Sequence, residues 1–274
     1  MNAIAIGPLI FSNDRFIAIL SVATFLLVSE FFAWRRPDTA KAIRRWSMIT
    51  VVTWIVAARL GFVIGNFDVF AEEPLSAFAL WQGGFDTRAG TFGLGVAIFL
   101  GMLLAPSVVK PIAVSLLLGG MTFQTAGFLL PYEPRGRIPS VSFADLEGNE
   151  IGLARDDGRP LVLNLWATWC PPCRREMPMM VRVAAAQENV PFIFANQGEH
   201  EETVQSYLRY NDLPIEGMVQ DPDSTLLAKF GVLGLPSTLF FSPDGRLKAV
   251  HTGEISRAAL LAQIKELEGE SDED

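Results

Sequence analysis

The chain of 274 residues has two cysteines, Cys170 and Cys173, which stand together in the segment WATWCPPCRREMP (166–178). Two thiols at this spacing can belong to a zinc site, close a structural disulfide or exchange electrons. A structural zinc site needs four ligands, and His200 and His251 do not follow a ligand-like spacing. A structural disulfide around so small a loop would constrain the unfolded chain little. The pair therefore favours thiol–disulfide exchange, and no metal site is predicted.

The thiolate is the attacking species in disulfide exchange, so Cys170 must ionise near neutral pH. The apolar run LVLNLW (161–166) predicts a buried strand that leads into the motif, and a helix is expected after it. Cys170 then lies at the positive end of a helix, which stabilises a negative charge. Trp169 and Pro171 are expected to leave its sulfur exposed. Cys173 is expected to be shielded, one helical turn further on, and to resolve the mixed disulfide.

The two prolines between the cysteines should also tune the thiolate. Pro171 and Pro172 have no backbone N–H, so two amides that could hydrogen-bond the sulfur are missing. We expect Cys170 to be less acidic than the cysteine of strongly oxidising dithiol proteins, whose pKa falls to about 3.5. A less stabilised thiolate makes the couple more reducing.

The charge divides the chain into two unlike halves. Residues 1–138 contain 11 Lys/Arg and 8 Asp/Glu, a net charge of +3, whereas residues 139–274 contain 11 and 22, a net charge of −11. The two values give the −8 of the whole chain. An apolar, slightly basic half followed by an acidic half of ordinary composition predicts a membrane region followed by a soluble domain. No basic patch favours nucleic acid as a partner.

The soluble half predicts short strands that alternate with helices. The expected elements are a hairpin over 141–153, a strand over 161–166, a helix to about 187, a strand over 191–196, helices over 201–211 and 223–230, a hairpin of 237–241 with 247–252, and a helix over 256–267. Their order is a β-hairpin followed by β-α-β-α-α-β-β-α. This predicts an α/β sandwich with one core.

Three motifs of this half resemble the thioredoxin superfamily, specifically its membrane-anchored extracytoplasmic branch of TlpA/ResA-like disulfide reductases. They are WCPPC after a buried strand, the following RREMP, and GLPST further along, and the resemblance covers about 139–268. It implies a cis Leu235–Pro236 peptide bond that faces the active-site disulfide. It also implies that Trp169, Leu235 and Pro236 bind the substrate chain.

Glu176 lies three residues after Cys173, on the same helical face, and in the resembling family a glutamate here helps to move the protons of the cysteines. Burial would raise the pKa of such a carboxyl and suit it to proton transfer at neutral pH. The alternative is a solvated acid in the first turns of the helix. Asn164 stands where cytoplasmic thioredoxins carry an acid, so proton handling should shift toward Glu176 or water. A hydrogen-bonded buried amide is the alternative role of Asn164.

Four apolar segments are each about long enough to cross a bilayer. They are 16–34, 47–66, 91–107 and 111–130, and LSAFALW (75–81) is too short and better suited to the interface. The expected organisation is an α-helical membrane domain of four transmembrane helices over 1–130, a linker over 131–138, an α/β thioredoxin-like domain over 139–268 and an acidic tail over 269–274.

The distribution of basic residues predicts the orientation of these helices. Five Lys/Arg lie in the predicted loop 35–46 and Lys110 lies in the predicted loop 108–110, whereas the loop 67–90 is mainly acidic. The positive-inside rule places 35–46 in the cytoplasm and the soluble domain outside. We therefore expect a multi-pass protein of a bacterial inner membrane, with this domain in the oxidising periplasm.

The segments AIGPL, AARLGFVIGNFDVF and WQGGFDTRAGTFGLG resemble the first half of prolipoprotein diacylglyceryl transferases, integral enzymes that move a lipid group onto lipoprotein cysteines. The resemblance covers about 1–130. Arg88 stands where that family has a histidine, and its later helices are replaced by the thioredoxin-like domain. Arg59 lies inside an apolar span, where a charge costs at least about 2.5–3.5 kcal/mol. It either binds the phosphate of an anionic lipid with Arg88, or reaches the interface, or pairs with Asp68.

The function expected from these features is that of a membrane-anchored periplasmic thiol–disulfide oxidoreductase that reduces disulfide-bearing client proteins. No organic or metal cofactor is expected, and a membrane dithiol donor must recharge the oxidised pair. The resemblance suggests the cysteines of apocytochrome c, in cytochrome c maturation, or of copper sites as clients. The alternatives are a net dithiol oxidase and a diacylglyceryl transferase carried by the membrane domain.

Overall fold

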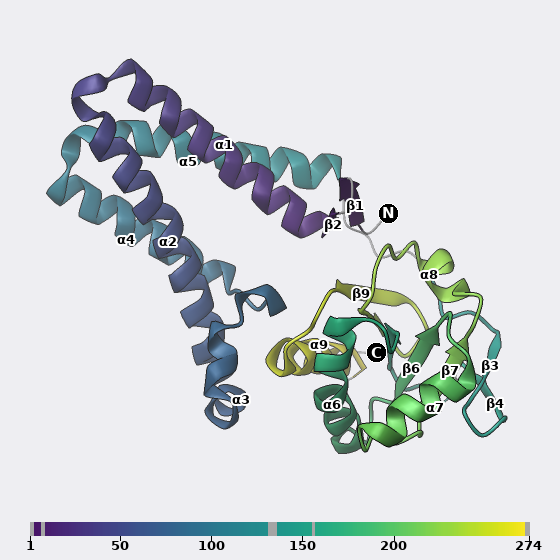
Figure 1. The fold of residues 1–274 in the computed structure, drawn as a ribbon. Coiled ribbons are helices and arrows are strands. Elements are labelled where there is room, and N and C mark those ends of the chain that lie inside the picture. Colours follow the sequence, from purple (N-terminus) through teal and green to yellow (C-terminus); the bar gives the residue numbers. More distant parts are fainter. Residues whose placement is uncertain (1–2, 7–8, 131–135, 155–156, 272–274) are drawn as a thin grey trace. The chain divides into compact units, whose positions relative to one another are not determined.

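The computed structural model describes residues 3–6, 9–130, 136–154 and 157–271. The chain forms two compact units, one of Phe11–Leu80 with Gly84–Tyr132, the other of Met1–Ile10, Trp81–Gly83 and Glu133–Asp274 (Figure 1). Most of the predicted linker, at 131–135, and the end of the predicted acidic tail, at 272–274, lie outside the described residues.

The first unit is built on four long apolar helices, as predicted. They are α1 (Asn13–Arg35), α2 (Ala40–Gly65), α4 (Thr87–Leu104) and α5 (Pro106–Leu129). Each is long and apolar enough to cross a membrane. A short 3₁₀ helix, η1 (Pro37–Thr39), joins α1 to α2.

The predicted loop at 108–110 is wrong, because α5 already begins at Pro106 and Lys110 lies within it. Proline is favoured at the first position of a helix, where its missing N–H needs no partner. Likewise α2 begins at Ala40, so part of the basic loop predicted over 35–46 is helical.

The helices α2 and α4 approach each other closely through small residues. A Cβ atom on Gly93 would lie 2.6 Å from the Cβ of Ala57, and one on Gly90 would lie 2.7 Å from the indole nitrogen of Trp54. Without a hydrophobic drive between helices in lipid, such close packing is a main source of association. The glycines of α4 therefore hold this pair together.

Short elements that the sequence did not predict complete the first part of the chain. They are strands β1 (Ala3–Ile6) and β2 (Leu9–Ser12), which pair, and α3 (Phe67–Glu72). The predicted interfacial segment 75–81 falls on two 3₁₀ helices, η2 (Pro74–Phe78) and η3 (Leu80–Gln82).

The second unit is an α/β domain around a five-stranded sheet with the order β7-β6-β5-β8-β9 (Figure 1). Its strands are β5 (Leu161–Trp166), β6 (Phe192–Gln197), β7 (Met218–Asp221), β8 (Ser237–Phe241) and β9 (Leu247–Thr252). Strands β5, β6 and β7 are parallel, and β8 and β9 are antiparallel to their neighbours. A hairpin of β3 (Ser142–Ala144) and β4 (Glu150–Gly152) precedes the sheet. The helices are α6 (Pro171–Ala186), α7 (Glu201–Tyr210), α8 (Thr225–Phe230) and α9 (Arg257–Ser271).

The predicted element order is confirmed except for β7, which the sequence did not reveal. The central strand β5 is buried along its whole length, which matches the continuous apolar run. Val162 and Trp166 join one core with residues of α6 and α9, whereas Leu163 joins a second core with residues of α8. Because side chains alternate along a strand, Asn164 faces the α6 side together with Val162 and Trp166.

Candidate active site

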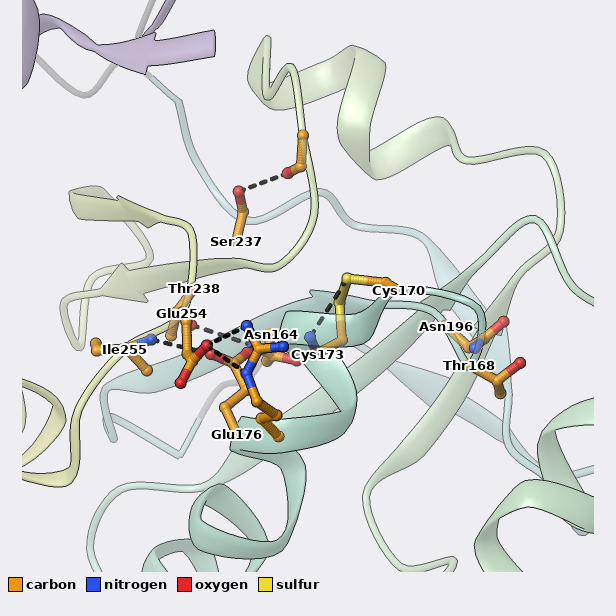
Figure 2. Close-up of a disulfide and its surroundings, with 12 residues drawn as sticks. Asn164, Thr168, Cys170, Cys173, Glu176, Asn196, Ser237, Thr238, Glu254 and Ile255 are labelled. Atoms are coloured by element: carbon orange, nitrogen blue, oxygen red, sulfur yellow. Dashed lines mark hydrogen bonds and ion pairs between the residues drawn. A yellow bond between two sulfur atoms is a disulfide. The ribbon is translucent and has the colours of Figure 1, made fainter. Parts of the chain in front are cut away.

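Cys170 and Cys173 form a disulfide at the start of α6 (Figure 2). The chain leaves β5 at Trp166, and Pro171 occupies the first helical position. Cys170 is the cap of the helix, with extended backbone angles (φ −85°, ψ 109°). The predicted position of the first cysteine at the positive end of a helix is therefore confirmed.

The predicted exposure of Cys170 is wrong for the disulfide form. Cys170 is 2% exposed and Cys173 is fully buried, as was predicted for the second cysteine alone. The disulfide joins Cys170 to Cys173, a residue of α6 that lies inside the core. Trp169, by contrast, is 67% exposed beside the pair.

One amide donor near the sulfur was missed. The N–H of Cys173 donates to Sγ of Cys170 at 3.3 Å (Figure 2). A side chain at the helix cap accepts from an amide in the first turn, and the prolines at the two preceding positions do not affect this donor. Pro171 and Pro172 still lack an N–H, so the first turn of α6, residues 171–173, offers the sulfur of Cys170 one hydrogen-bond donor, the N–H of Cys173.

Glu176 is 2% exposed, within the core side of α6. Its carboxylate oxygens accept from Asn164 Nδ2 at 3.1 Å and from the N–H of Ile255 at 3.0 Å (Figure 2). Burial raises the pKa of Glu176 to about 8, and the two hydrogen bonds oppose this rise without cancelling it. The solvated alternative is therefore wrong, and the predicted burial of the carboxyl, which raises its pKa, is confirmed. Its part in moving the protons of the cysteines stays a prediction.

Asn164 joins the strand to the helix. Its Nδ2 also donates to Oγ1 of Thr238 in β8 at 3.2 Å. The one amide group of Asn164, in β5, therefore links the neighbouring strand β8 to the helix α6. Its Oδ1 has no hydrogen-bond partner among the described residues. The hydrogen-bonded buried amide, one of the two roles considered for Asn164, is confirmed. The shift of proton handling toward Glu176 or water stays a prediction.

The loop before α9 holds the other side of Glu176. Glu254 forms an ion pair with Arg175 at 2.6 Å, and Ile255, the next residue, donates its N–H to Glu176. The Glu254 side chain is 9% exposed, whereas that of Arg175 is 58% exposed, so only the carboxylate of this pair is shielded from solvent. The acid of α6 is thus fixed from the strand side and from the loop side.

The Leu235–Pro236 peptide bond is cis, as the resemblance implied. Leu235 is half-buried against the core that contains both cysteines, and Pro236 is buried. The carbonyl of Pro236 accepts from the N–H of Gly253, and Oγ of Ser237 donates to the carbonyl of Gly234. These bonds anchor the GLPST segment at the start of β8.

Sequence reasoning missed Glu199, which supports the loop in front of the cysteines. Its carboxylate accepts from the N–H of Thr168 at 2.6 Å, from the Thr168 hydroxyl and from Asn196 Nδ2 at 2.8 Å. Thr168 follows β5 and Glu199 follows β6, and these strands are parallel neighbours. Their ends meet at the same sheet edge, which is the signal that could have found the contact.

In the unit of four long helices, Arg59 is buried and donates to backbone carbonyls. Its Nε bonds Ala77 O at 2.8 Å, Nη1 bonds Gly84 O at 2.9 Å and Nη2 bonds Ser76 O at 2.8 Å. The expected pairing with Asp68 is wrong among the described residues, since the guanidinium is drawn to the carbonyls of the segment after α3 instead. Two of these bonds go to Ser76 and Ala77, within the segment 75–81 predicted to lie at the interface, so a reach toward the interface stays a prediction.

Aromatic rings complete the surroundings of Arg59. Its guanidinium carbon lies 5.8, 5.5 and 5.9 Å from the ring centres of Phe62, Phe70 and Phe85. Such contacts stabilise a cation away from water. Arg88, its expected partner for a lipid phosphate, is exposed in the first turn of α4. This arrangement favours a structural role for Arg59.

Two family models match the chain, the AhpC/TSA family over residues 134–250 and the prolipoprotein diacylglyceryl transferase family over residues 3–152. The thiol-disulfide oxidoreductase ResA of Halalkalibacterium halodurans is 35% identical over 153 residues, which are 54% of this chain and 84% of that relative. ResA of Geobacillus thermodenitrificans is 30% identical over 131 residues, which are 47% of this chain and 75% of that relative.

Among solved structures, that of MTB dsbF in its mixed oxidized and reduced forms is 30% identical, with a TM-score of 0.42, over 47% of this chain and 95% of that one. The family-model match at the amino terminus spans more than half of the chain. The two ResA proteins are matched over most of their own length. The chain therefore belongs to the ResA family of thiol-disulfide oxidoreductases, fused to an amino-terminal region of the prolipoprotein diacylglyceryl transferase family.

Proposed function

We propose that this enzyme is anchored in a bacterial inner membrane and reduces the disulfides of client proteins on the periplasmic side. The observation that carries the proposal is the disulfide at the tip of α6 combined with the buried Glu176 on the same helix. An exchangeable thiol pair needs a group that releases and takes up protons close to neutral pH, and a carboxyl with a pKa of about 8 meets that need.

The proposed cycle begins from the dithiol. The thiolate of Cys170 attacks one sulfur of a client disulfide, and the other client sulfur leaves as a thiolate. Cys173 then gives its proton to Glu176 and attacks Cys170, which releases the second client sulfur and forms the Cys170–Cys173 disulfide. The two client thiolates then take up two protons, one from Glu176 and one from water, so the client has gained two electrons and two protons in total. A membrane dithiol donor returns the same number to the enzyme, and no metal or organic cofactor takes part.

Client binding is assigned to Trp169, Leu235 and Pro236. The exposed indole of Trp169 offers an apolar surface beside the pair, and Leu235 packs at the edge of the core that holds it. The reducing direction is supported by Pro171 and Pro172, because a single amide near Cys170 stabilises its thiolate less than three would.

The membrane placement is supported by the four apolar helices and by the basic residues near the α1–α2 junction. We propose a membrane domain over 1–130 and a periplasmic thioredoxin-like domain over 139–268. Cysteines of apocytochrome c or of copper sites are the proposed clients, from the resemblance to the TlpA/ResA-like branch.

The reduction potential of the full chain in detergent tests the direction. The chain is equilibrated with glutathione or dithiothreitol buffers and its free thiols are alkylated. The reduction potential should then lie close to that of thioredoxin, about −270 mV. A reduction potential close to that of strong periplasmic oxidants, about −120 mV, would instead identify a net oxidase.

Labelling of Cys170 in intact cells with a membrane-impermeant reagent tests on which side of the membrane the cysteines lie. Labelling only after lysis would contradict the periplasmic placement. Consumption of labelled phosphatidylglycerol that survives Cys170→Ser would reveal a transferase.

A further inference from the structure

The membrane unit has a hollow at the end where α1 turns into α2 and α4 turns into α5. The hollow has a volume of about 500 Å³ and is open to solvent, since its lining residues are exposed except for the half-buried Thr39. Its wall combines the last residue of α1, the η1 turn and the first turns of α5. All of these belong to one compact unit, so the hollow is defined within that unit.

The charge of the wall is mainly positive. Arg35, Arg36 and Lys110 line it, with Asp38 as the single acid, which leaves a net charge of +2. Among the described residues, the side chains of Arg36 and Lys110 take part in no ion pair or hydrogen bond. Arg35 lies over aromatic rings of its own helix, 5.1 and 5.8 Å from their centres. The wall therefore holds cations that the rest of the described protein does not neutralise.

A neighbouring arginine shows the contrast. Arg44, on the first turns of α2, pairs with Glu30, and its Nε lies 2.9 Å from a carboxylate oxygen. Arg36 and Lys110, by contrast, line the hollow without such a partner among the described residues, whereas Lys41 and Arg45 lie outside its wall. A role in membrane orientation alone does not require Arg36 and Lys110 to converge on one hollow.

The surroundings of the wall are apolar. Trp34 is 71% exposed next to Arg35 in the chain, and Leu103 and Leu104 at the end of α4 are 64% and 73% exposed. The cavity wall continues directly with Pro106, where α5 begins, and the positive end of that helix adds to the attraction for an anion. Cations in a hollow bordered by exposed apolar side chains match a phosphate that carries acyl chains.

We propose that this hollow binds the phosphate head group of an anionic phospholipid, held by Arg36 and Lys110 with support from Arg35, with its acyl chains along the ends of α1 and α4. Basic pockets between membrane helices bind such head groups in other proteins. The proposal rests on the membrane insertion proposed above but not on the redox chemistry, and it holds for either orientation of the helices.

Native mass spectrometry of the full chain in a mild detergent tests the site, with phosphatidylglycerol and phosphatidylcholine of the same acyl chains. The wild type should bind phosphatidylglycerol more tightly. The double variant Arg36→Gln/Lys110→Gln should weaken this binding roughly 25-fold, at about fivefold for each cation near an anionic surface. The matched control Lys41→Gln/Arg45→Gln removes two charges outside the wall and should retain the preference.

A charge-conserving variant, Arg36→Lys/Lys110→Arg, separates loss of charge from loss of fold and should bind phosphatidylglycerol like the wild type. Equal binding of the two lipids, or equal weakening in both Gln double variants, would overturn the site, as would weakening in the charge-conserving variant. So would inorganic phosphate that displaces the lipid at millimolar concentration, because the site would then be one for free phosphate. A chain recovered in the soluble fraction of lysed cells would overturn the membrane insertion as well, whereas a membrane-bound chain without lipid preference overturns this site alone.

Discussion

Replacement of Glu176 by glutamine tests the central electrostatic feature of the active site. The carboxyl is buried and accepts one hydrogen bond from Asn164 and one from the backbone of Ile255. Glutamine has nearly the same shape and is neutral at every pH. The substitution therefore removes the ionisation while it keeps most of the packing.

The magnitude follows from the pKa of Glu176, which burial raises from 4.5 to about 8. At about 1.36 kcal/mol for each pH unit, the difference corresponds to about 4–5 kcal/mol. The folded protein holds the proton more tightly than the unfolded chain, so the stabilisation is complete below about pH 4.5 and is lost as the pH rises toward about 8. Above that pH the wild type should have lost about 4 kcal/mol of its unfolding free energy, and Glu176→Gln should not show this loss.

Urea denaturation of the soluble part, from residue 136 onward, measures this effect through the fluorescence of the buried Trp166. At about pH 5 the variant and the wild type should have similar stability, and at about pH 9 the variant should be the more stable. The exposed Glu188, changed to Gln, serves as the matched control and should follow the wild type. Parallel pH profiles for Glu176→Gln and the wild type would refute the assigned pKa, and with it the proton-transfer role.

Three further substitutions probe other contacts. Glu199→Gln weakens the acceptor for the Thr168 N–H and should cost about 1–2 kcal/mol in urea denaturation, whereas an unchanged midpoint would deny this support of the cysteine loop. Arg59→Gln leaves three carbonyls without their donor and should cost at least about 3 kcal/mol, seen as a lower melting temperature in detergent. A variant that lost only lipid binding would contradict the structural role. Trp169→Ala removes an exposed indole and should change stability by less than about 0.5 kcal/mol. It should raise KM for a client peptide about tenfold, and an unchanged KM would exclude the indole from client binding.

The membrane helices were predictable because a bilayer requires long apolar runs, and four such runs stand out in the sequence. Their ends were less predictable. The first turns of α2 and α5 carry basic residues, which look like loops by hydropathy, yet helix formation needs only that their side chains reach water or a partner. Arg44 meets this condition through Glu30, and Lys110 through the hollow at the start of α5.

In the soluble domain, strand β7 escaped prediction for a similar reason. The segment Met218–Asp221 is short, and half of it is polar. Its place in the sheet comes from pairing with β6 rather than from its own pattern. Asp221, the last residue of β7, has a second role, because its carboxylate accepts from the N–H groups of Thr225 and Leu226 at the start of α8.

In the active site, too, residues within a local motif were predictable from the sequence, whereas contacts between distant segments were not. Cys170, Cys173, Glu176 and the cis bond before Pro236 were recognised, because each belongs to a local motif of fixed spacing. The contacts of Glu199 were not, because they join residues that only the sheet brings together. Likewise the backbone N–H of Ile255 has no sequence signature, since every residue except proline carries one.

The identity of residue 164 shows how one strand position shapes the chemistry of the helix above it. A second acid there would lie within hydrogen-bond distance of Glu176, and two buried carboxyls at that distance would share one proton, with one pKa pushed still higher. An amide instead donates to the carboxyl, which lowers the pKa of Glu176 from what burial alone would give. Asn164 thus keeps a single proton-carrying group within reach of neutral pH. In the proposed cycle, the proton released by the resolving cysteine then has one buried acceptor rather than a coupled pair.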